Sequence, residues 1–383
     1  MKVLFFTSWY PNPDAPQHGD FIQRHAEAIA EHPDVQLGLI FVKANKKGSS
    51  KHFELREETV NNVLTLRVFY KASRNPLIKA KRYRKAYEHG LQFYMHKIGK
   101  PDIIHANVVW PSGIAAKSIA KKHALPFVIT EHWSVYYPNS EIKLNFAQRN
   151  RIANAVVAAK RVITVSKYLE RCMVDMGFHG EYEQIPNVVN TSLFLPENTA
   201  VKRDFTFVHI SNFTENKRAI DILEAFENSL KKRQDIRLKF IGEGPELAEI
   251  KEILQDEPAL SKKVDILGSV NHDEVARELR NSDALILFSK YEGLPCVILE
   301  AWCTGIPVIS TNVGGIKDYF QNDSGILLQG ESIEELQHAL LEISQDTNKY
   351  DPTKISDYAK GQFSNKSVAD KFVALYQAVI SSK

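Results

Sequence analysis

Short apolar runs alternate with longer segments of helical period along most of this chain. In the first half, six apolar runs predict β-strands, at Lys2–Thr7, Val35–Val42, Val63–Phe69, Ile103–Ala106, Phe127–Thr130 and Val162–Val165. Between Leu77 and Ile98 the apolar positions recur every three or four residues, which is the spacing of one face of a helix. Strands that alternate with helices predict parallel sheets with both faces covered.

The same pattern starts again in the second half. Six further runs predict strands at Phe205–Ile210, Arg237–Ile241, Val264–Leu267, Ala284–Phe288, Pro307–Ser310 and Gly325–Leu328. The segment Ile185–Thr199 is rich in Pro, Asn and Thr, a composition typical of a linker. We therefore predict an α/β protein with two Rossmann-like, doubly wound domains, 1–189 and 190–364, that face a central cleft. A last helix within 365–383 can pack on either domain and is assigned to the first.

Length and composition fit two globular domains. The chain has 383 residues and a net charge of +3, which gives no argument for binding nucleic acid. Its three cysteines form no C-x-x-C pair, and this fits a reducing cytosol. The N-terminus has no signal-peptide cleavage site, and no apolar run is long enough to span a membrane. We therefore expect a cytoplasmic protein.

The segment that begins at Ser289 carries the densest chemistry. Glu292 lies in a loop after an apolar strand, and Pro295 suits the first turn of a helix that contains Glu300. Both carboxylates are then near the carboxyl end of a strand, where they can accept hydrogen bonds from sugar hydroxyls. The pair Gly314-Gly315 precedes a short helix, and backbone amides in such a position can hold a diphosphate.

In this arrangement the sequence resembles glycosyltransferase family 4, the group 1 glycosyl transferases. The resemblance rests on Glu292-x7-Glu300 within E-G-x-P and E-A, followed by G-x-P-V and by Gly314-Gly315. It implies the GT-B fold, retention of anomeric configuration and a UDP- or GDP-linked sugar as donor. The resemblance implies that Glu292 holds hydroxyls of the transferred sugar and Glu300 the ribose hydroxyls. Gly293 and Leu294 are further predicted donor-binding residues. Apart from the resemblance, Glu300 could be a solvated helix residue and the glycines ordinary turns.

The stretch H-I-S-N-F-T-E-N-K-R, from His209 to Arg218, ends the first strand of the second domain. The family often has Arg followed five residues later by Lys here, both directed at the diphosphate. This chain keeps Lys217 but has Asn212 at the Arg position, so Arg218 is a candidate for the missing charge. We predict that Lys217 and the amides of Gly314 and Gly315 stabilise the leaving group. The alternative is that Lys217 is a surface lysine.

Two segments of the first domain also resemble the family. The long first loop closes on Gly19, where the missing side chain would let an acceptor approach the backbone. His132, in T-E-H-W-S, resembles the T-x-H segment near the reacting centre and is predicted to hydrogen-bond the donor sugar. The predicted catalytic set is thus Glu292, His132 and Lys217. His105 is predicted to be structural, and Ser166 to be a helix N-cap.

Other motifs argue against dinucleotide binding and against a metal-dependent enzyme. The segment I-G-E-G-P-E-L-A, from Ile241 to Ala248, imitates a dinucleotide fingerprint, but Pro245 lacks an amide that a phosphate would need, which favours a plain strand-to-helix turn. The sequence has no D-x-D and no metal-binding motif, so we expect a metal-independent enzyme without a cofactor. The predicted function is transfer of a hexose to a glycan or lipid-linked acceptor in cell-surface polysaccharide biosynthesis. The alternatives are a nucleotide-sugar epimerase or hydrolase, a transferase with a small soluble acceptor, and a non-catalytic sugar-binding protein.

The predicted helix from Leu77 to Ile98 is unusually basic at its start. Nine basic residues and one acidic residue lie between Lys71 and Lys100. Five of the basic residues fall in the first turns: Lys79, Lys81, Arg82, Arg84 and Lys85. This face could dock on anionic lipid at the inner face of the plasma membrane, with about 1 kcal/mol from each residue near the surface. The alternative is that the basic face is merely solvated.

Overall fold

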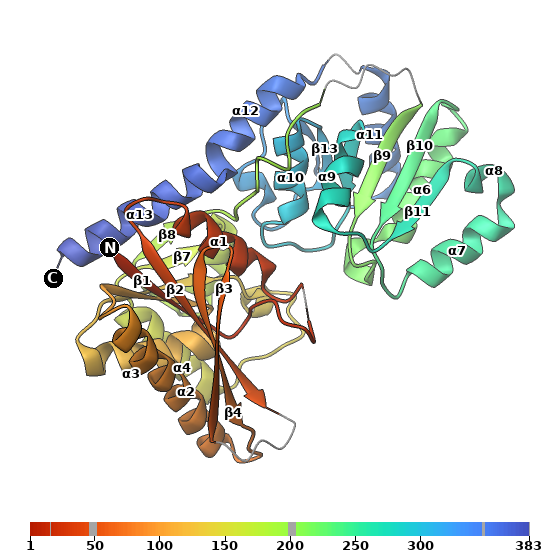
Figure 1. Ribbon diagram of the computed structural model, residues 1–383. Helices are drawn as coiled ribbons and strands as arrows, with labels where there is room; N and C mark the ends of the chain where they lie inside the picture. The colour runs from red at the N-terminus through yellow and green to blue at the C-terminus, as the bar shows by residue number, and fades with distance from the viewer. Residues whose placement is uncertain (16, 46–51, 198–203, 347–348, 383) are drawn as a thin grey trace. The chain divides into compact units, whose positions relative to one another are not determined.

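The computed structural model describes residues 1–15, 17–45, 52–197, 204–346 and 349–382. The chain divides into two compact units (Figure 1). The first unit comprises Met1–Val188 and the C-terminal segment from Asn365, and the second comprises Val189–Ser364. Each unit is built on a mainly parallel sheet with helices packed on it, which confirms the predicted α/β fold class.

The first unit contains an eight-stranded sheet in the order β3-β4-β2-β1-β5-β6-β7-β8. All neighbouring strands are parallel except β3 and β4. The strands are β1 (Lys2–Thr7), β2 (Gln36–Asn45), β3 (Phe53–Val60), β4 (Val63–Lys71), β5 (Ile103–Asn107), β6 (Phe127–Glu131), β7 (Val162–Thr164) and β8 (Tyr182–Gln184). The six predicted strands are found, and β3 and β8 are additions.

The edge strand β3 was missed because its sequence, F-E-L-R-E-E-T-V, is largely charged and exposed. It pairs antiparallel with β4 through a tight hairpin. The turn residues Asn61 and Asn62 both have positive φ, 45° and 65°. Two such residues form the turn that matches the twist of a hairpin, and asparagine tolerates this conformation better than most residues. The Asn-Asn pair was therefore the feature of the sequence from which the hairpin could have been predicted.

Helices cover both faces of this sheet. On one face, α1 (Asp20–Ala30) packs against α13 (Asn365–Ser381), the last helix of the chain. Their core includes Phe5, Ile29, Phe372 and Tyr376. The other helices of the unit are α2 (Pro76–Lys97), α3 (Ile114–His123), α4 (Phe146–Ala158) and α5 (Lys167–Asp175).

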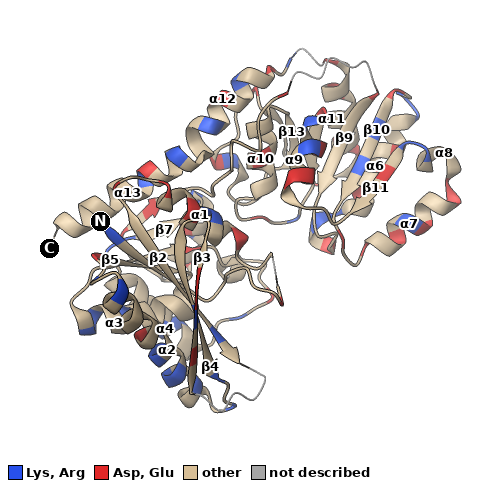
Figure 2. Cartoon of the chain, in the orientation of Figure 1, with Lys and Arg blue, Asp and Glu red and all other residues tan. Residues whose placement is uncertain are grey.

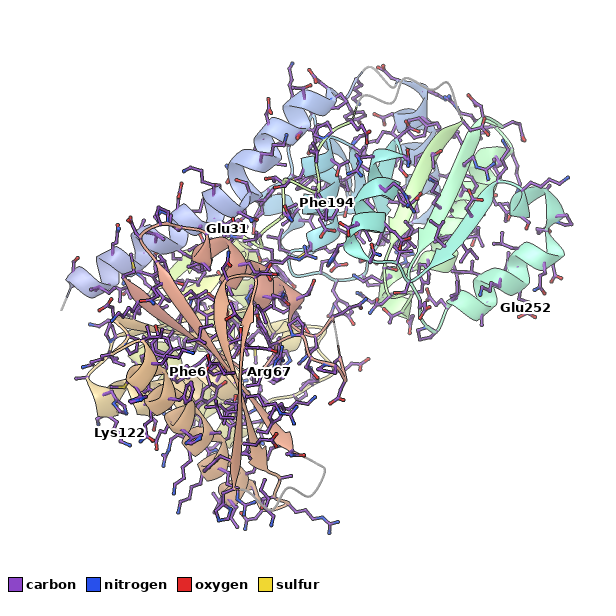
Figure 3. The ribbon with its side chains drawn as sticks, viewed as in Figure 1. Phe6, Glu31, Arg67, Lys122, Phe194 and Glu252 are labelled. Atoms are coloured by element: carbon purple, nitrogen blue, oxygen red, sulfur yellow. The ribbon has the colours of Figure 1, made fainter. Side chains whose placement is uncertain are left out.

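Helix α2 lies unusually close to β2. A Cβ at Gly38 would lie 2.4 Å from a ring carbon of Tyr94, and one at Gly90 would lie 2.9 Å from the Ile40 side chain. Beside this contact lies Phe6 of β1, which is labelled in Figure 3. Its ring stacks on Tyr87 of α2 with ring centroids 4.5 Å apart. Glycine is thus required on both elements so that the aromatic side chains can fill the layer between helix and sheet.

The second unit contains a six-stranded parallel sheet in the order β11-β10-β9-β12-β13-β14. The strands are β9 (Phe205–Ile210), β10 (Ile236–Ile241), β11 (Val264–Gly268), β12 (Ala284–Leu287), β13 (Val308–Thr311) and β14 (Gly325–Leu328). The helices are α6 (Ala219–Leu230), α7 (Leu247–Asp256), α8 (Pro258–Ser261), α9 (His272–Arg280), α10 (Cys296–Thr304), α11 (Ile333–Gln345) and α12 (Pro352–Phe363). Parallel strands end at one edge, so the loops after β9, β12 and β13 lie together there.

We predict that Gly38→Ala destabilises the first unit by about 1–3 kcal/mol, because the added methyl overpacks the layer under Tyr94. Gly361→Ala in α12 is the matched control. A Cβ there meets no atom within 4 Å, so alanine should stabilise that helix by about 0.5–1 kcal/mol. Calorimetric unfolding of both variants gives the comparison. An unchanged unfolding temperature for Gly38→Ala would show that the layer is looser than described.

Candidate functional site

Two loops at the carboxyl edge of the second sheet are joined through one asparagine. The strands that precede them, β9 and β12, are parallel neighbours. The Asn216 side chain donates to the Tyr291 carbonyl at 3.1 Å and accepts from the Tyr291 amide at 3.0 Å. The Lys290 amide donates to the Asn216 carbonyl at 2.9 Å. Residues 75 positions apart in sequence are therefore held in a fixed register.

This register brings Lys217 and Glu292 together. The Lys217 ammonium donates to Glu292 Oε1 at 2.5 Å. Only 18% of the lysine side chain and 10% of the glutamate side chain is exposed, so the pair is largely screened from water. A charged hydrogen bond in such surroundings is stronger than one at the open surface. The site thus presents a cation and a carboxylate side by side, one suited to phosphate and the other to hydroxyl groups.

The glycine pair after β13 packs on the backbone beside Glu292. Gly314 has φ of 63°, and a Cβ on it would lie 2.0 Å from the Glu292 carbonyl oxygen. The Gly315 amide donates to the Gly293 carbonyl at 2.7 Å. The helical segment that follows has only three residues. The two glycines thus allow the loop after β13 to approach Glu292, and their binding of a diphosphate stays a prediction.

Arg218 is also engaged within the second unit. Its guanidinium lies 4.1 Å from the centre of the Phe288 ring. Its Nε donates to Asp221 at 2.5 Å, and one terminal nitrogen donates to the Glu331 carbonyl at 2.9 Å. A role for Arg218 at the diphosphate, in place of the family's arginine, stays a prediction. The guanidinium anchors the start of α6 to neighbouring loops.

The other residues that were predicted to bind the donor lie on the same loops and on the helix between them. Asn212 is exposed in the loop after β9, and its side-chain oxygen accepts from the Thr214 hydroxyl at 3.4 Å. Leu294 is 6% exposed just before α10. Glu300 lies in α10 and is 4% exposed, which excludes a solvated helix residue. Pro295 is the N-cap residue of this helix, one position before its first turn.

Sequence reasoning missed His209, the buried histidine of β9. Its Nδ1 lies 3.0 Å from the Ile286 carbonyl of β12, and its Nε2 lies 2.7 Å from the Ser211 hydroxyl. Burial lowers the pKa of His209 to about 4, so the ring is neutral near pH 7. The Ser211 hydroxyl in turn accepts from the Phe213 amide. A histidine inside an apolar strand was the feature of the sequence from which this role could have been predicted. Through these contacts His209 fixes the start of the loop that carries Lys217.

The turn after β10 also packs directly on this loop. A Cβ at Gly242 would lie 1.8 Å from the Ser211 carbonyl oxygen, and one at Gly244 would lie 1.8 Å from the Asn212 carbonyl oxygen. The glycines of the I-G-E-G segment therefore permit contact between two backbones. This confirms the prediction of a strand-to-helix turn.

In the first unit, a buried glutamate organises the loops that follow β5 and β6. Both oxygens of Glu131 accept hydrogen bonds, from the amides of Val109, His132 and Trp133 at 2.7–2.9 Å and from the Tyr136 hydroxyl at 3.1 Å. Burial raises the pKa of Glu131, and these donors oppose the shift. Sequence reasoning missed Glu131, although it precedes His132 directly. Its carboxylate holds the backbone of the loop after β5, at Val109, and of the loop after β6, at His132 and Trp133.

His132 lies in a cluster of neutral rings. Its ring centroid is 4.5 Å from that of Phe21 and 5.6 Å from that of His25. Burial is the main reason why the pKa of His132 is well below its usual value. His25 has a pKa lowered to about 4, also by burial, and its Nε2 lies 3.0 Å from the Pro186 carbonyl. At neutral pH His132 can therefore form hydrogen bonds without carrying a charge.

Two further predictions in the first unit have clear outcomes. His105 is structural, as predicted, with its two ring nitrogens 2.6 Å from the Tyr376 and Thr130 hydroxyls. Ser166 is the N-cap of α5, and its hydroxyl accepts from the Leu169 amide. At Gly19 a Cβ would lie 2.6 Å from the Trp9 carbonyl carbon, so the glycine admits the chain's own backbone. Its role toward an acceptor stays a prediction.

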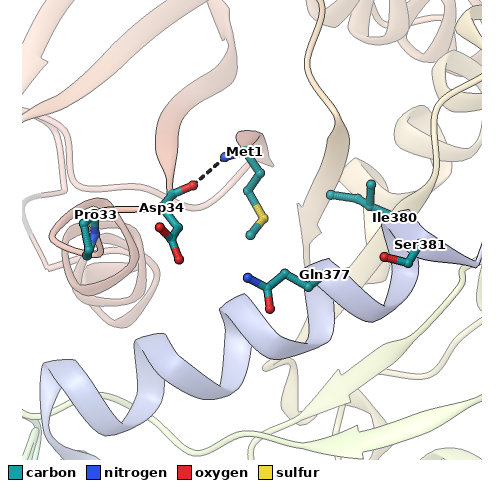
Figure 4. A pocket seen from close by; sticks show the side chains of 6 residues that line it. All are labelled: Met1, Pro33, Asp34, Gln377, Ile380 and Ser381. Atoms are coloured by element: carbon teal, nitrogen blue, oxygen red, sulfur yellow. Dashed lines mark hydrogen bonds between the residues drawn. The ribbon is translucent and has the colours of Figure 1, made fainter.

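One open hollow of about 540 Å³ lies away from these loops (Figure 4). It is lined by Met1, Pro33, Asp34, Gln377, Ile380 and Ser381, at the amino end of β1. Ligands of parallel sheets bind at the carboxyl ends of the strands, so this hollow is not a candidate. Among the described residues, no group of three His, Cys, Asp or Glu side chains is arranged to hold a metal ion. Metal independence stays a prediction.

Two family profiles match the chain. The profile of Glycosyltransferase Family 4 matches residues 46–193, and that of Glycosyl transferases group 1 matches residues 193–362. The chain belongs to glycosyltransferase family 4. It is thus a glycosyltransferase, and its two α/β units are those of the GT-B fold. Within the described ranges, no helix is both long and apolar enough to cross a membrane.

Relatives of this chain carry the names of glycosyltransferases that differ in acceptor. The chain is 26% identical over 371 residues to TuaC of Bacillus subtilis, named as a teichuronic acid biosynthesis glycosyltransferase, and covers 88% of it. This match spans 89% of the present chain. The chain is also 29% identical over 206 residues to N-acetyl-alpha-D-glucosaminyl L-malate synthase of Bacillus anthracis. This second match spans 49% of the present chain and 52% of that protein.

Solved structures share the fold. Sucrose-phosphate synthase of Thermosynechococcus elongatus superposes with a TM-score of 0.76 at 18% identity, over 100% of both chains. HepE of Anabaena, solved in complex with UDP-glucose, gives a TM-score of 0.70 at 16% identity, over 99% of this chain and 100% of that one. These superpositions show that the chain shares the overall fold of both proteins.

The buried histidines of the first unit predict a specific pH dependence. The folded-state pKa of His25 is about 4, against 6.5 unperturbed, so the unfolded chain takes up a proton that the folded chain refuses. His25 therefore contributes no penalty above pH 6.5, and stability falls as the pH drops from there toward 4, by up to about 3 kcal/mol. His25→Gln can still donate to the Pro186 carbonyl and does not titrate.

Unfolding temperatures between pH 8 and pH 4 check this prediction. The expected result is a shallower loss of stability in acid for His25→Gln than for the wild type. His179→Gln is the control, since that histidine is exposed. Parallel curves for His25→Gln and the wild type would contradict the assignment.

Proposed function

We propose that the enzyme transfers a hexose from a UDP- or GDP-linked sugar to a hydroxyl of a glycan or lipid-linked acceptor, with retention of configuration. The Lys217–Glu292 pair at the ends of two adjacent strands is the observation that carries the proposal. A nucleotide-sugar requires one group for the diphosphate and another for the sugar hydroxyls, and here both are held in one register by Asn216.

The pair also suggests how the donor enters. A diphosphate carries more negative charge than a carboxylate, so it competes with Glu292 for the Lys217 ammonium. When Lys217 turns to the diphosphate, the Glu292 carboxylate becomes available to accept from sugar hydroxyls. Glu300 would bind the ribose hydroxyls. In this scheme donor binding converts an internal ion pair into two contacts with the ligand.

In the chemical step, the enzyme acts by stabilising charge. The bond between the anomeric carbon and the diphosphate breaks, the sugar gains oxocarbenium character, and Lys217 stabilises the charge on the departing diphosphate. The acceptor hydroxyl attacks from the same face, and the departing phosphate takes its proton. His132 would hydrogen-bond the donor sugar as a neutral ring. No residue is assigned as a covalent nucleophile.

Relatives support a role in cell-surface polysaccharide biosynthesis, since TuaC is named for teichuronic acid and others for glycolipids. The relative named N-acetyl-alpha-D-glucosaminyl L-malate synthase supports the second candidate, a transferase with a small soluble acceptor. An epimerase or hydrolase would consume donor without an acceptor, which separates it from both.

We further propose that α2 docks the first unit on anionic lipid at the inner face of the plasma membrane. The first turns of this helix are exposed and basic (Figure 2), through Lys79, Lys81, Arg84 and Lys85. Leu77 and Ile78 beside them are 71% and 43% exposed. Basic side chains around exposed apolar ones are the combination that binds a negatively charged bilayer surface. Such docking would bring the enzyme to a lipid-linked acceptor.

Glu292→Ala should abolish most turnover and keep or raise the affinity for the nucleoside diphosphate, because it frees the Lys217 ammonium. Glu300→Ala should instead weaken nucleotide binding by about 10-fold or more, through loss of a charged hydrogen bond to ribose. Titration calorimetry with UDP and GDP measures both. Glu215→Ala is the control, an exposed glutamate on the same loop that pairs with Lys290. Equal losses of affinity for Glu292→Ala and Glu300→Ala would refute the division of roles.

Transfer activity should survive excess EDTA, because the sequence offers no D-x-D carboxylate pair for a divalent ion and the proposal assigns the charge to Lys217. A transfer assay with and without the chelator decides the point. Activity that is lost in EDTA and restored by magnesium or manganese would contradict the scheme.

Replacing Lys79, Lys81, Arg84 and Lys85 with Gln should lower binding to anionic vesicles at least 10-fold, since each residue contributes about 1 kcal/mol near the surface. Arg82 is left in place because its guanidinium holds the carbonyls of Lys71 and Ala72. Sedimentation with phosphatidylserine-containing and neutral vesicles measures binding. The control changes the same charge in the second unit, at Lys231, Lys232, Lys251 and Lys262. Equal recovery with both kinds of vesicle would favour a soluble acceptor.

A further inference from the structure

One valine of the first unit has a strained backbone. Val108 directly follows β5, is fully buried and has φ of 61° and ψ of 139°. This ψ lies outside the left-handed helical region, the one part of positive-φ space that other residue types enter with any frequency. Among the described residues, Val108 is the only valine, isoleucine or threonine with positive φ. Such strain persists only where the surrounding structure enforces it, and it is concentrated at functional sites.

A second unfavourable feature lies at the preceding residue. Asn107 ends β5 and is fully buried. Within the part of the chain that the structure describes, neither atom of its side-chain amide has a hydrogen-bond partner. Buried polar groups are nearly always paired in native proteins. Two adjacent residues thus make this turn costly, so other contacts of the turn must offset the cost.

Hydrogen bonds on both sides hold Val108 in its conformation. Its amide donates to the Thr130 carbonyl at 2.7 Å, which continues the pairing of β5 with β6. Its carbonyl accepts from the Ser112 hydroxyl at 2.8 Å and from the Gly113 amide at 3.2 Å. The peptide groups before and after Val108 are therefore both fixed.

The strained turn directs one amide to Glu131. The φ and ψ angles of Val108 set the direction of the next peptide. The amide of that peptide, at Val109, donates to Glu131 Oε2 at 2.9 Å. Without this donor, the buried oxygen would be left with the Tyr136 hydroxyl, 3.1 Å away. A buried carboxylate that loses a hydrogen bond is strongly destabilising, so this contact offsets the strain.

The other oxygen of the same carboxylate holds the loop that contains His132. Glu131 Oε1 accepts from the His132 amide at 2.7 Å and from the Trp133 amide at 2.8 Å. A displacement of the carboxylate would therefore move the backbone of His132 as well. One side chain thus links the conformation of Val108 to the position of the histidine.

We infer that Val108 is a positioning residue, whose strained turn fixes the backbone of His132 through the Glu131 carboxylate. The inference rests on the proposed function, in which His132 binds the donor sugar. A relaxed turn at Val108 would release the Val109 amide from Glu131, and the histidine would lose its fixed position.

The strain is tested by comparing glycine with alanine at the same position. At most positions glycine is the less stable of the two, because it gives the unfolded chain more freedom. Val108→Gly should nevertheless unfold about 2–4 °C above Val108→Ala, since glycine adopts positive φ without strain. Val109 is the matched control, because it is equally buried and its φ is not positive, and there alanine should be the more stable. A lower unfolding temperature for Val108→Gly than for Val108→Ala would overturn the inference.

The position of His132 is read from its ring signal, by NMR of the full chain with isotope-labelled histidine. His132→Gln identifies the signal. Val108→Ala should shift or broaden it, and Val108→Gly should return it to its wild-type position. A role confined to packing predicts the opposite order, because glycine removes more of the side chain. The opposite order, or a signal that neither variant moves, would contradict the positioning role.

The path through Glu131 is tested in a second background. Glu131→Gln keeps the shape of the side chain but cannot accept hydrogen bonds at both ends. In that background Val108→Ala and Val108→Gly should give the same His132 signal, because the link is broken. Glu141→Gln, which changes an exposed glutamate, is the control and should leave the difference intact. A difference that persists in Glu131→Gln would show that the two residues are not linked through Glu131.

Turnover and nucleotide binding keep the two proposals apart. With UDP-glucose and GDP-mannose as donors, Val108→Ala should turn over at least about 10-fold more slowly than Val108→Gly. Both variants should bind UDP and GDP as the wild type does, since the proposed nucleotide contacts are in the second unit. Equal turnover of the two variants would overturn the inference alone. A wild-type chain that binds neither nucleotide would refute the proposed function instead.

Discussion

The Asn216 side chain fixes the geometry on which the candidate site of the second unit depends. It bonds to both the amide and the carbonyl of Tyr291 and so replaces the hydrogen bonds that a further pair of strand residues would make. The parallel pairing of β9 and β12 is thereby extended beyond the sheet. Lys217 and Glu292 are each the next residue after this clamp, which is why two long side chains meet with so little freedom.

Much of the fold could be predicted because apolar periodicity reports burial. The two halves of the sequence repeat the strand–helix alternation, and the observed sheets follow it. The charged edge strand β3 could not be found this way, since an edge strand with one partner and solvent on its faces has no apolar pattern. The three-residue strand β8 is too short to show any period.

For the candidate site, the sequence predicts positions better than contacts. Lys217 and Glu292 were both predicted at the donor, and the structure brings their side chains together. For Arg218 and Gly315 the sequence gives a position along the chain but not the direction of the donor groups. In the structure the arginine turns to Phe288 and Asp221, and the glycine amide turns to Gly293. Glu131 and His209 were missed because a buried polar residue that serves the backbone has no distinctive spacing.

The last helix of the chain completes the first unit. Helix α13 supplies Val368, Phe372, Leu375, Tyr376 and Val379 to the core that β1 and α1 begin. The chain therefore leaves the first unit after Val188 and returns to it at Asn365, and the two crossings run side by side, with the Val189 amide bonded to the Phe363 carbonyl. During synthesis on the ribosome, the second unit can fold as soon as it emerges. The first unit must wait for α13, which is made after the whole second unit, so it is the later of the two to reach its native core.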